Sequence, residues 1–270
     1  MIQEVCKNIK FVGCDDPELR LFEGQYVTPE GMCYNSYVIL DDQIAIMDTI
    51  DPRCQEEWAA KVEKALDGRQ PDYLVVHHME PDHAGSIARL LNTYPNVKVV
   101  CSAMAQKMLK QFNEDLDLTD RVQAVKEGDT LSLGHCTLQF IAAPSVHWPE
   151  VMMSYVPEEQ VLFSADGFGK FGVYDAGAAD WACEARRYYF NICGKYGVQV
   201  AKALGKVAAL SGVKAICPLH GPVLKDEAMQ EALRLYNIWA HYEVETPGVF
   251  IAYASAHGGT AAAAEKMRDL

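Results

Sequence analysis

The sequence is short of positive charge and of long apolar runs. It has 24 Lys and Arg residues against 37 Asp and Glu residues, and its formal net charge is −13. Such a chain would not neutralise a phosphate backbone, so we exclude a nucleic-acid partner. No apolar stretch approaches the length of a membrane span, and residues 1–7 contain no apolar signal core. We therefore expect a soluble cytoplasmic protein with no membrane partner.

Cysteine pairs of the Cys-x-x-Cys type are also missing. The nine cysteines are scattered along the chain, and their number is odd. This pattern argues against a disulfide framework and against a thiolate metal site. Cys101 and Cys217 each end an apolar run, as buried residues do. We expect reduced, mostly buried thiols.

The hydrophobic pattern predicts a mixed α/β chain. With 270 residues and 50% hydrophobic content, the sequence can form one large domain or one and a half smaller ones. An early hairpin implies a partly antiparallel sheet. We expect strands at 35–40, 43–47, 97–101, 137–142, 151–155, 160–164 and 214–217, with helices at 55–66, 84–92, 103–112, 178–210 (with breaks at Gly194 and Gly197) and 226–240.

The most informative stretch lies between Leu74 and Ser86. Its apolar, β-branched beginning predicts a buried strand that ends in four possible metal ligands: His78, Glu80, Asp82 and His83. Two imidazoles with two carboxylates form a harder donor set than imidazoles alone. This mixture favours iron or manganese over zinc.

Three later strands run into a single donor followed by a Gly- or Pro-rich turn. These donors are His147, Asp166 and His220. Each alone would be read as an ordinary capping or core residue, but loops at one sheet edge can aim side chains at a common point. Seven donors are too many for one tetrahedral ion and suit two metals that share a bridging carboxylate.

The remaining histidines receive a structural interpretation. His77 precedes the first ligand on the strand, so its side chain should point to the opposite face. His135, His241 and His257 have no donor cluster near them in the sequence. We expect them to be surface or structural groups.

The combined pattern resembles the diiron site of the flavodiiron proteins (A-type flavoproteins). Flanking motifs agree over essentially the whole chain, among them residues 34–37 (Tyr-Asn-Ser-Tyr), 47–51 (Met-Asp-Thr-Ile-Asp), 144–149 (Pro-Ser-Val-His-Trp-Pro) and 217–222 (Cys-Pro-Leu-His-Gly-Pro). The resemblance implies a metallo-β-lactamase-like domain, a four-layer αββα sandwich, that reduces dioxygen to water or nitric oxide to nitrous oxide. Hydrolytic relatives usually have a histidine where this chain has Glu80.

The resemblance also implies ligand roles. One iron would take His78, Glu80 and His147, and Asp166 would bridge to a second iron held by the remaining three donors, Asp82, His83 and His220. The residue that matches His83 binds iron in some members and not in others. Trp148 and the aromatic run 188–190, which begins with Tyr188, are candidate pocket residues, although core packing is the plainer interpretation of each.

Residues 247–270 resemble the opening of the family's second, flavodoxin-like domain, which binds FMN. We expect a strand from Gly248, a phosphate loop and a helix over 261–267; the loop residues are Ser255, His257, Gly258, Gly259 and Thr260. About 23 residues cannot form a doubly wound sheet. We therefore expect residues 1–246 to be the diiron domain, residues 247–270 a truncated flavodoxin-like start, and the chain a fragment of a longer enzyme rather than a natural split protein.

Three functions follow as hypotheses. The first is the diiron domain of an oxygen or nitric oxide reductase with electrons from FMN, working in a head-to-tail homodimer or with a flavodoxin-domain partner. A rubredoxin-like or flavin protein would be the electron donor. The second is a dinuclear metallo-hydrolase of the same superfamily, and the third is a metal-bearing module that is inactive without a flavin partner.

Overall fold

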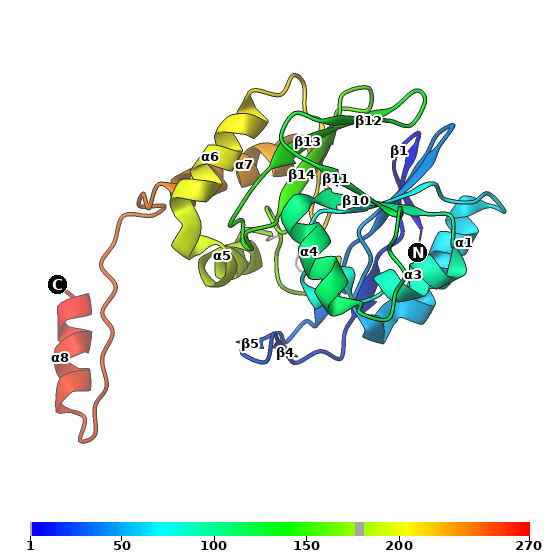
Figure 1. Ribbon diagram of the computed structural model, residues 1–270. Coiled ribbons are helices and arrows are strands. Elements are labelled where there is room, and N and C mark those ends of the chain that lie inside the picture. The colour runs from blue at the N-terminus through cyan, green and yellow to red at the C-terminus, as the bar shows by residue number, and fades with distance from the viewer. Residues whose placement is uncertain (1, 176–180) are drawn as a thin grey trace.

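Two β-sheets form the centre of the molecule, and helices cover their outer sides (Figure 1). The computed structural model describes residues 2–175 and 181–270. The first sheet has seven strands in the order β1-β2-β7-β8-β9-β10-β11, and the second has six in the order β12-β13-β14-β15-β16-β17. The strands of the first sheet are β1 (Gln3–Cys6), β2 (Ile9–Phe11), β7 (Tyr37–Leu40), β8 (Ile44–Met47), β9 (Tyr73–Val76), β10 (Lys98–Ser102) and β11 (Val122–Val125). Those of the second are β12 (Thr130–Ser132), β13 (Thr137–Ala142), β14 (Met152–Val156), β15 (Val161–Phe163), β16 (Ala215–Cys217) and β17 (Leu224–Lys225).

The helices divide between the two outer faces. Along the chain they are η1 (Pro52–Cys54), α1 (Gln55–Leu66), α2 (Pro81–Ala84), α3 (Ile87–Thr93), α4 (Ala103–Phe112), α5 (Trp181–Ile192), η3 (Gly194–Tyr196), α6 (Gly197–Ala208), α7 (Asp226–Ala240) and α8 (Gly259–Arg268). Helices α1, α3 and α4 lie on the side of the first sheet, and α5, α6 and α7 on the side of the second (Figure 1). Two short two-stranded sheets, β3 (Cys14–Asp16) with β6 (Met32–Tyr34) and the hairpin of β4 (Leu21–Phe22) with β5 (Tyr26–Val27), complete the fold.

Alternation along the strands separates two apolar cores. In β8, Ile44 and Ile46 join the core beneath the helices, while Ala45 and Met47 join the core between the sheets. Successive side chains of a strand point to opposite faces, so one central strand can serve both cores. This pattern confirms the predicted four-layer αββα sandwich.

Strand direction brings the ligand-bearing loops to common edges. Strand β9 runs parallel to β8 and β10 in the first sheet. In the second sheet β15 and β16 are parallel, and β13 has the same direction because both β13 and β15 pair antiparallel with β14. The chain therefore leaves β13, β15 and β16 at the same edge, where the predicted donors follow.

Most of the expected elements are confirmed. The helices 55–66, 103–112 and 226–240 and the strand 137–142 have the predicted bounds, and Ser102 caps α4 by accepting a hydrogen bond from the Ala105 N–H. The expected helix 178–210 is divided at Gly194 and Gly197 into α5, η3 and α6, and its first residues, 178–180, lie outside the described part. All nine cysteines are free.

The prediction of a strand from Gly248 was wrong. Residues 248–258, all of them described, form no strand, and helix α8 begins at Gly259 rather than at 261. A strand needs a neighbouring chain to pair its N–H and C=O groups, and this segment extends away from both sheets (Figure 1). In the described residues, no helix is long and apolar enough to cross a membrane.

Candidate metal centre

The first four donors lie where β9 ends. His78 follows the strand, Glu80 is the residue before the one-turn helix α2, and Asp82 and His83 lie within that helix. Pro81 occupies the first helical position, where a missing N–H costs no hydrogen bond. The turn folds the chain back, and all four donor side chains are buried or nearly so.

The other three donors come from the second sheet. His147 lies in the loop between β13 and β14, Asp166 follows β15, and His220 follows β16. Ala165 has the left-handed φ of 51°, which turns the chain sharply just before Asp166. Gly221 has φ 82°, and a Cβ there would lie 2.8 Å from Lys170 Cγ, so the turn after His220 requires glycine.

The first donor group consists of His78, Glu80, His147 and Asp166. Glu80 Oε2 lies 3.2 Å from His78 Nε2 and 3.0 Å from His147 Nε2. Asp166 Oδ2 lies 3.4 Å from His78 Nε2 and 3.0 Å from His147 Nε2. The four donor atoms all lie within 4.8 Å of one another. They can surround a single ion.

The second donor group consists of Asp82, His83 and His220, whose donor atoms also lie within 4.8 Å of one another. Asp82 Oδ2 lies 3.4 Å from His83 Nε2 and 3.3 Å from His220 Nε2. Asp166 Oδ1 is 3.2 Å from His83 Nε2 and 3.9 Å from His220 Nε2. Asp166 thus presents one oxygen to each group and stands between them.

Several of these buried donor atoms have no hydrogen-bond partner among residues 2–175 and 181–270. They are both carboxylate oxygens of Asp82 and of Asp166, and the Nε2 atoms of His83 and His220. A buried polar atom without a partner costs about 1–3 kcal/mol. Metal ions between the two groups would satisfy these atoms together. The residues present therefore fit a dinuclear metal centre.

The electrostatics favour a cation at the same place. Burial alone would lower the pKa of His147, but its ion-pair contact with Asp166 and its hydrogen bond with Glu80 raise it to about 9. Burial would raise the pKa of Asp166, yet the charge of His78 and the close contacts with the His147 and His83 rings hold it well below its usual value. The carboxylates therefore stay ionised and favour positive charge on their neighbours, which a bound cation would also supply.

Two motifs of the first sheet hold the ligand loops in place. Asn35 Nδ2 donates hydrogen bonds to the carbonyls of Pro218 and Gly221, at 2.8 and 2.7 Å, and so fixes both sides of His220. Thr49 Oγ1 donates to the carbonyl of His83 at 2.7 Å. Sequence reasoning quoted both motifs without assigning these residues a role. Asn35 lies just before β7 and Thr49 just after β8, so their signal was a polar residue beside the end of an apolar strand.

His77 points away from the donors, as the strand period predicts. Its Nδ1 donates to Asp48 Oδ2 at 2.5 Å, and its Nε2 lies 2.8 Å from Ser154 Oγ. All three side chains are buried. They link β9 to the end of β8 and to β14, and we assign them a structural role. His135, His241 and His257 are exposed, as expected.

Aromatic rings close the centre on two sides. The Trp148 ring meets the His78 ring edge-on at 5.2 Å between centroids, and the Tyr188 ring lies 5.6 Å from that of His220. Phe22, from the β4–β5 hairpin, packs edge-on against His220 at 5.5 Å. Trp148 and Tyr188 were predicted as pocket residues, whereas Phe22 was missed. Phe190, from the same aromatic run as Tyr188, is 52% exposed and does not belong to the pocket.

Glu23, in the turn of the β4–β5 hairpin, is a further acidic group that sequence reasoning missed. Partial burial and the negative charge of Glu80 raise the pKa of Glu23 to about 7. A lone glutamate in a surface turn gives no sequence signal. The hairpin therefore brings a carboxyl group as well as an aromatic ring to the centre.

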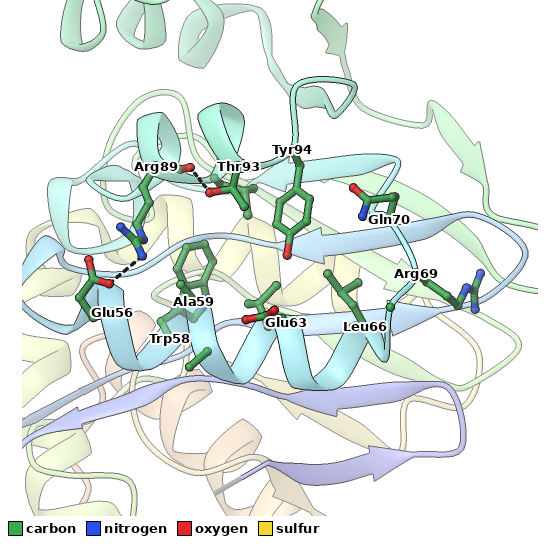
Figure 2. A pocket seen from close by; sticks show the side chains of 14 residues that line it. Glu56, Trp58, Ala59, Glu63, Leu66, Arg69, Gln70, Arg89, Thr93 and Tyr94 are labelled. Atoms are coloured by element: carbon green, nitrogen blue, oxygen red, sulfur yellow. Dashed lines mark hydrogen bonds and ion pairs between the residues drawn. The ribbon is translucent and has the colours of Figure 1, made fainter.

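A separate surface cleft of about 560 Å³ lies between α1 and α3 (Figure 2). Glu56 and Arg89 form an ion pair across one end of it, with Arg89 Nη2 2.7 Å from Glu56 Oε2. Trp58, Glu63 and Tyr94 also line it. It contains none of the seven donors, so it is not part of the metal centre.

The suggested phosphate loop lies far from the centre along the chain. Gly258 precedes α8 with the left-handed φ of 82°, and Gly259 and Thr260 begin the helix. Ser255 and His257 lie just before it, and all five residues are exposed. The backbone N–H groups of this first turn are open to a ligand.

Comparison with known proteins agrees with the fold and the donor set. The model of the ODP family beta lactamase matches residues 32–221. A nitric oxide reductase of Moorella thermoacetica is 33% identical over 98% of this chain and 67% of its own length. The flavo-diiron protein FprA2 of Clostridium acetobutylicum is 31% identical, over 94% of this chain and 65% of its own.

Solved structures give the same result. The flavodiiron protein from Giardia intestinalis superposes with a TM-score of 0.82 at 31% identity, over 89% of this chain and 59% of its own. Rubredoxin oxygen:oxidoreductase from Desulfovibrio gigas superposes with a TM-score of 0.83 at 30% identity, over 89% of this chain and 62% of its own. The chain thus spans between 59 and 67% of the length of these four relatives. With its metallo-β-lactamase-like fold and its Glu-containing donor set, the chain belongs to the flavodiiron proteins.

Proposed function

We propose that this chain is the diiron part of an oxygen or nitric oxide reductase. The observation that carries the proposal is the pair of donor groups joined by Asp166, with Glu80 as a carboxylate ligand in the first. Carboxylate donors are hard and favour iron over zinc. Relatives named as nitric oxide reductase and as rubredoxin oxygen:oxidoreductase support the same chemistry.

Each donor has a place in this proposal. His78, Glu80 and His147 would hold one iron, and Asp166 would bridge through its two oxygens. The second donor group, Asp82, His83 and His220, would hold the other iron. When bound, the two irons supply electrons to the substrate. Dioxygen and nitric oxide are both small and uncharged, so the charged groups around the site do not select between them.

The surrounding residues prepare the site. Asn35 and Thr49 fix the loops of His220 and His83, so the donors keep their positions when no substrate is bound. Trp148 and Tyr188 limit the access of water. Burial, together with the charge of Asp166, raises the pKa of Tyr188 well above its usual value, so its hydroxyl keeps its proton beside the centre.

FMN is the proposed second cofactor of the whole protein. We assign residues 1–246 to the diiron domain and 247–270 to the start of a flavodoxin-like domain. The exposed turn before α8, which includes Ser255, His257, Gly258, Gly259 and Thr260, would contribute to the FMN phosphate site. A relative named diflavin flavoprotein supports a flavin.

The proposed partners follow from the electron supply. Reduction of two nitric oxide molecules to nitrous oxide takes two electrons, whereas reduction of dioxygen to water takes four. Two ferrous ions supply only two electrons, so the dioxygen reaction needs the flavin. We propose a head-to-tail homodimer or a flavodoxin-type partner that brings FMN to the centre, with a rubredoxin-like or flavin protein as donor. A relative named flavorubredoxin supports this choice.

The test is a single turnover of the iron-loaded chain. Metal-free protein is loaded anaerobically with two equivalents of ferrous iron and mixed with nitric oxide or dioxygen in a stopped-flow instrument, which follows the oxidation of iron. After the reaction with nitric oxide, the nitrous oxide formed is measured by gas chromatography. We expect rapid oxidation of both irons and one nitrous oxide per chain. Asp166→Asn should abolish both the rapid iron oxidation and the formation of nitrous oxide.

Other outcomes would replace the proposal. Tightly held zinc with esterase activity would identify a metallo-hydrolase instead. Two bound irons that are not oxidised within seconds by either gas would identify a metal-bearing module without reductase activity. Glu63→Gln, at an exposed position of α1, is the matched control for the removal of one carboxylate.

A further inference from the structure

Glu150 lies behind His78, on the side of the ring that faces away from the donor groups. Its Oε1 atom accepts hydrogen bonds from His78 Nδ1 at 2.8 Å and from the Met79 N–H at 2.9 Å. Its side chain is 0% exposed. Ser102 Oγ donates to the Glu150 carbonyl at 2.8 Å and so ties this residue to the end of β10. The carboxylate is therefore held rigidly against the ring.

The other ligand rings are supported differently. His220 Nδ1 donates to the backbone carbonyl of Cys33 at 2.7 Å, which is a neutral acceptor. His83 Nδ1 is buried and has no hydrogen-bond partner among the described residues. A carboxylate behind a metal-bound imidazole fixes its tautomer and raises its basicity more than a carbonyl does. The two donor groups thus differ in what lies behind their histidines.

The negative charges are distributed in the same unequal way. Glu80 belongs to the first donor group and Asp82 to the second, and Asp166 is shared by both. These three carboxylates alone would give the two metal positions the same number of negatively charged ligands. Glu150, buried against His78, adds one negative charge to the first position and none to the second.

We propose that Glu150 is a positioning residue that makes the two metal positions unequal, so that the first donor group fills first and binds ferrous iron more tightly. This inference rests on the proposed diiron function. The geometry carries it: Glu150 Oε1 accepts from both the His78 ring and the Met79 N–H. Outer residues that support a metal ligand typically contribute 10- to 100-fold in metal affinity.

The first experiment uses the unaltered chain. Metal-free protein is crystallised anaerobically with one equivalent of ferrous iron, and the anomalous scattering of iron gives the occupancy of each position. We expect iron at the first donor group, with the second largely empty. Equal occupancy, or more iron at the second donor group, would overturn the inference, and this result does not depend on the folding of any variant.

The second experiment uses Glu150→Gln, which keeps the shape and one acceptor oxygen but removes the charge. Ferrous binding is measured by anaerobic equilibrium dialysis. We expect the affinity for the first equivalent to fall by about 10- to 100-fold, with little change for the second. Glu150→Asp should recover part of the loss because it restores the charge, and Glu63→Gln should behave like the unaltered chain.

The outcomes separate the two proposals. If the unaltered chain binds no iron, the proposed diiron function fails, and this inference fails with it. If it binds two irons and Glu150→Gln binds them with unchanged affinities, the diiron function stands, and the role of Glu150 is wrong. The Mössbauer spectrum of the loaded chain is a second readout: its two iron signals should become more alike in Glu150→Gln.

Discussion

Replacement of Glu80 by histidine tests the role of the carboxylate in metal choice. Glu80 Oε2 lies 3.2 Å from His78 Nε2 and 3.0 Å from His147 Nε2, within the first donor group. Its charge is therefore no more than 4.8 Å from the other donor atoms of that group. At an effective dielectric constant of about 20, two unit charges at that separation interact by about 3.5 kcal/mol.

This energy bears on the oxidation state of the metal. Oxidation from ferrous to ferric iron adds one positive charge, which Glu80 stabilises and a neutral imidazole does not. Glu80→His should therefore raise the reduction potential of the iron at this position by about 150 mV. It should also shift metal preference toward zinc, because an imidazole-rich site binds zinc well.

The assay is competitive loading. Metal-free protein is incubated anaerobically with equal amounts of ferrous iron and zinc, and the bound metals are quantified by mass spectrometry. We expect the zinc-to-iron ratio to rise at least about tenfold in Glu80→His, and to change less in Glu80→Gln, which adds no imidazole. An unchanged ratio and an unchanged potential in Glu80→His would refute the reasoning, and Glu63→Gln controls for the loss of a charge elsewhere.

Three further predictions concern stability and reactivity. Asn35→Ala removes two buried hydrogen bonds. It leaves the Gly221 carbonyl without its partner, whereas the Pro218 carbonyl still accepts from the Tyr37 hydroxyl. Urea unfolding should therefore show a loss of about 1–3 kcal/mol in the free energy of unfolding; a loss below about 0.5 kcal/mol would contradict this. Ferrous iron at about 100 times its Kd should raise the Tm of the metal-free chain by about 5–10 °C for each occupied metal position, measured by anaerobic calorimetry. An unchanged Tm would mean that the chain has no tight iron site. Iodoacetamide at pH 8 should label the exposed Cys183 before the buried Cys14, because only the thiolate reacts and burial raises the pKa of Cys14 to about 12. The rate of Cys14 labelling should therefore increase with pH up to that value. Peptide mass spectrometry follows both sites, and labelling of Cys14 before Cys183 at pH 8 would contradict the prediction.

Much of the fold could be predicted because local signals and tertiary structure agree. Helix 226–240 has an apolar period of 3.6, and the strand 137–142 has a period of 2, so pattern alone places their ends. The strand expected from Gly248 fails for the opposite reason. Its composition suits a strand, but a strand also needs a neighbour, and periodicity carries no information about neighbours.

The donors could be predicted, but their supports could not. His78, Asp166 and His220 each follow an apolar strand, and this context is visible in the sequence. Glu150 and Asn35 act on residues more than 70 and 180 positions away, respectively. No spacing rule reports such a contact, because it depends on how two sheets pack. Glu23 and Phe22 were missed for the same reason, since a short hairpin brings them to the centre.

The claim that Asp166 joins two metal positions is tested most directly by anaerobic binding of ferrous iron to the metal-free chain. Asp166 presents one oxygen to each donor group, so its removal should weaken both positions. We expect two irons per unaltered chain, with the affinity for both greatly reduced in Asp166→Ala. A single iron per unaltered chain, or two irons bound equally well by Asp166→Ala, would contradict a dinuclear centre built on that carboxylate.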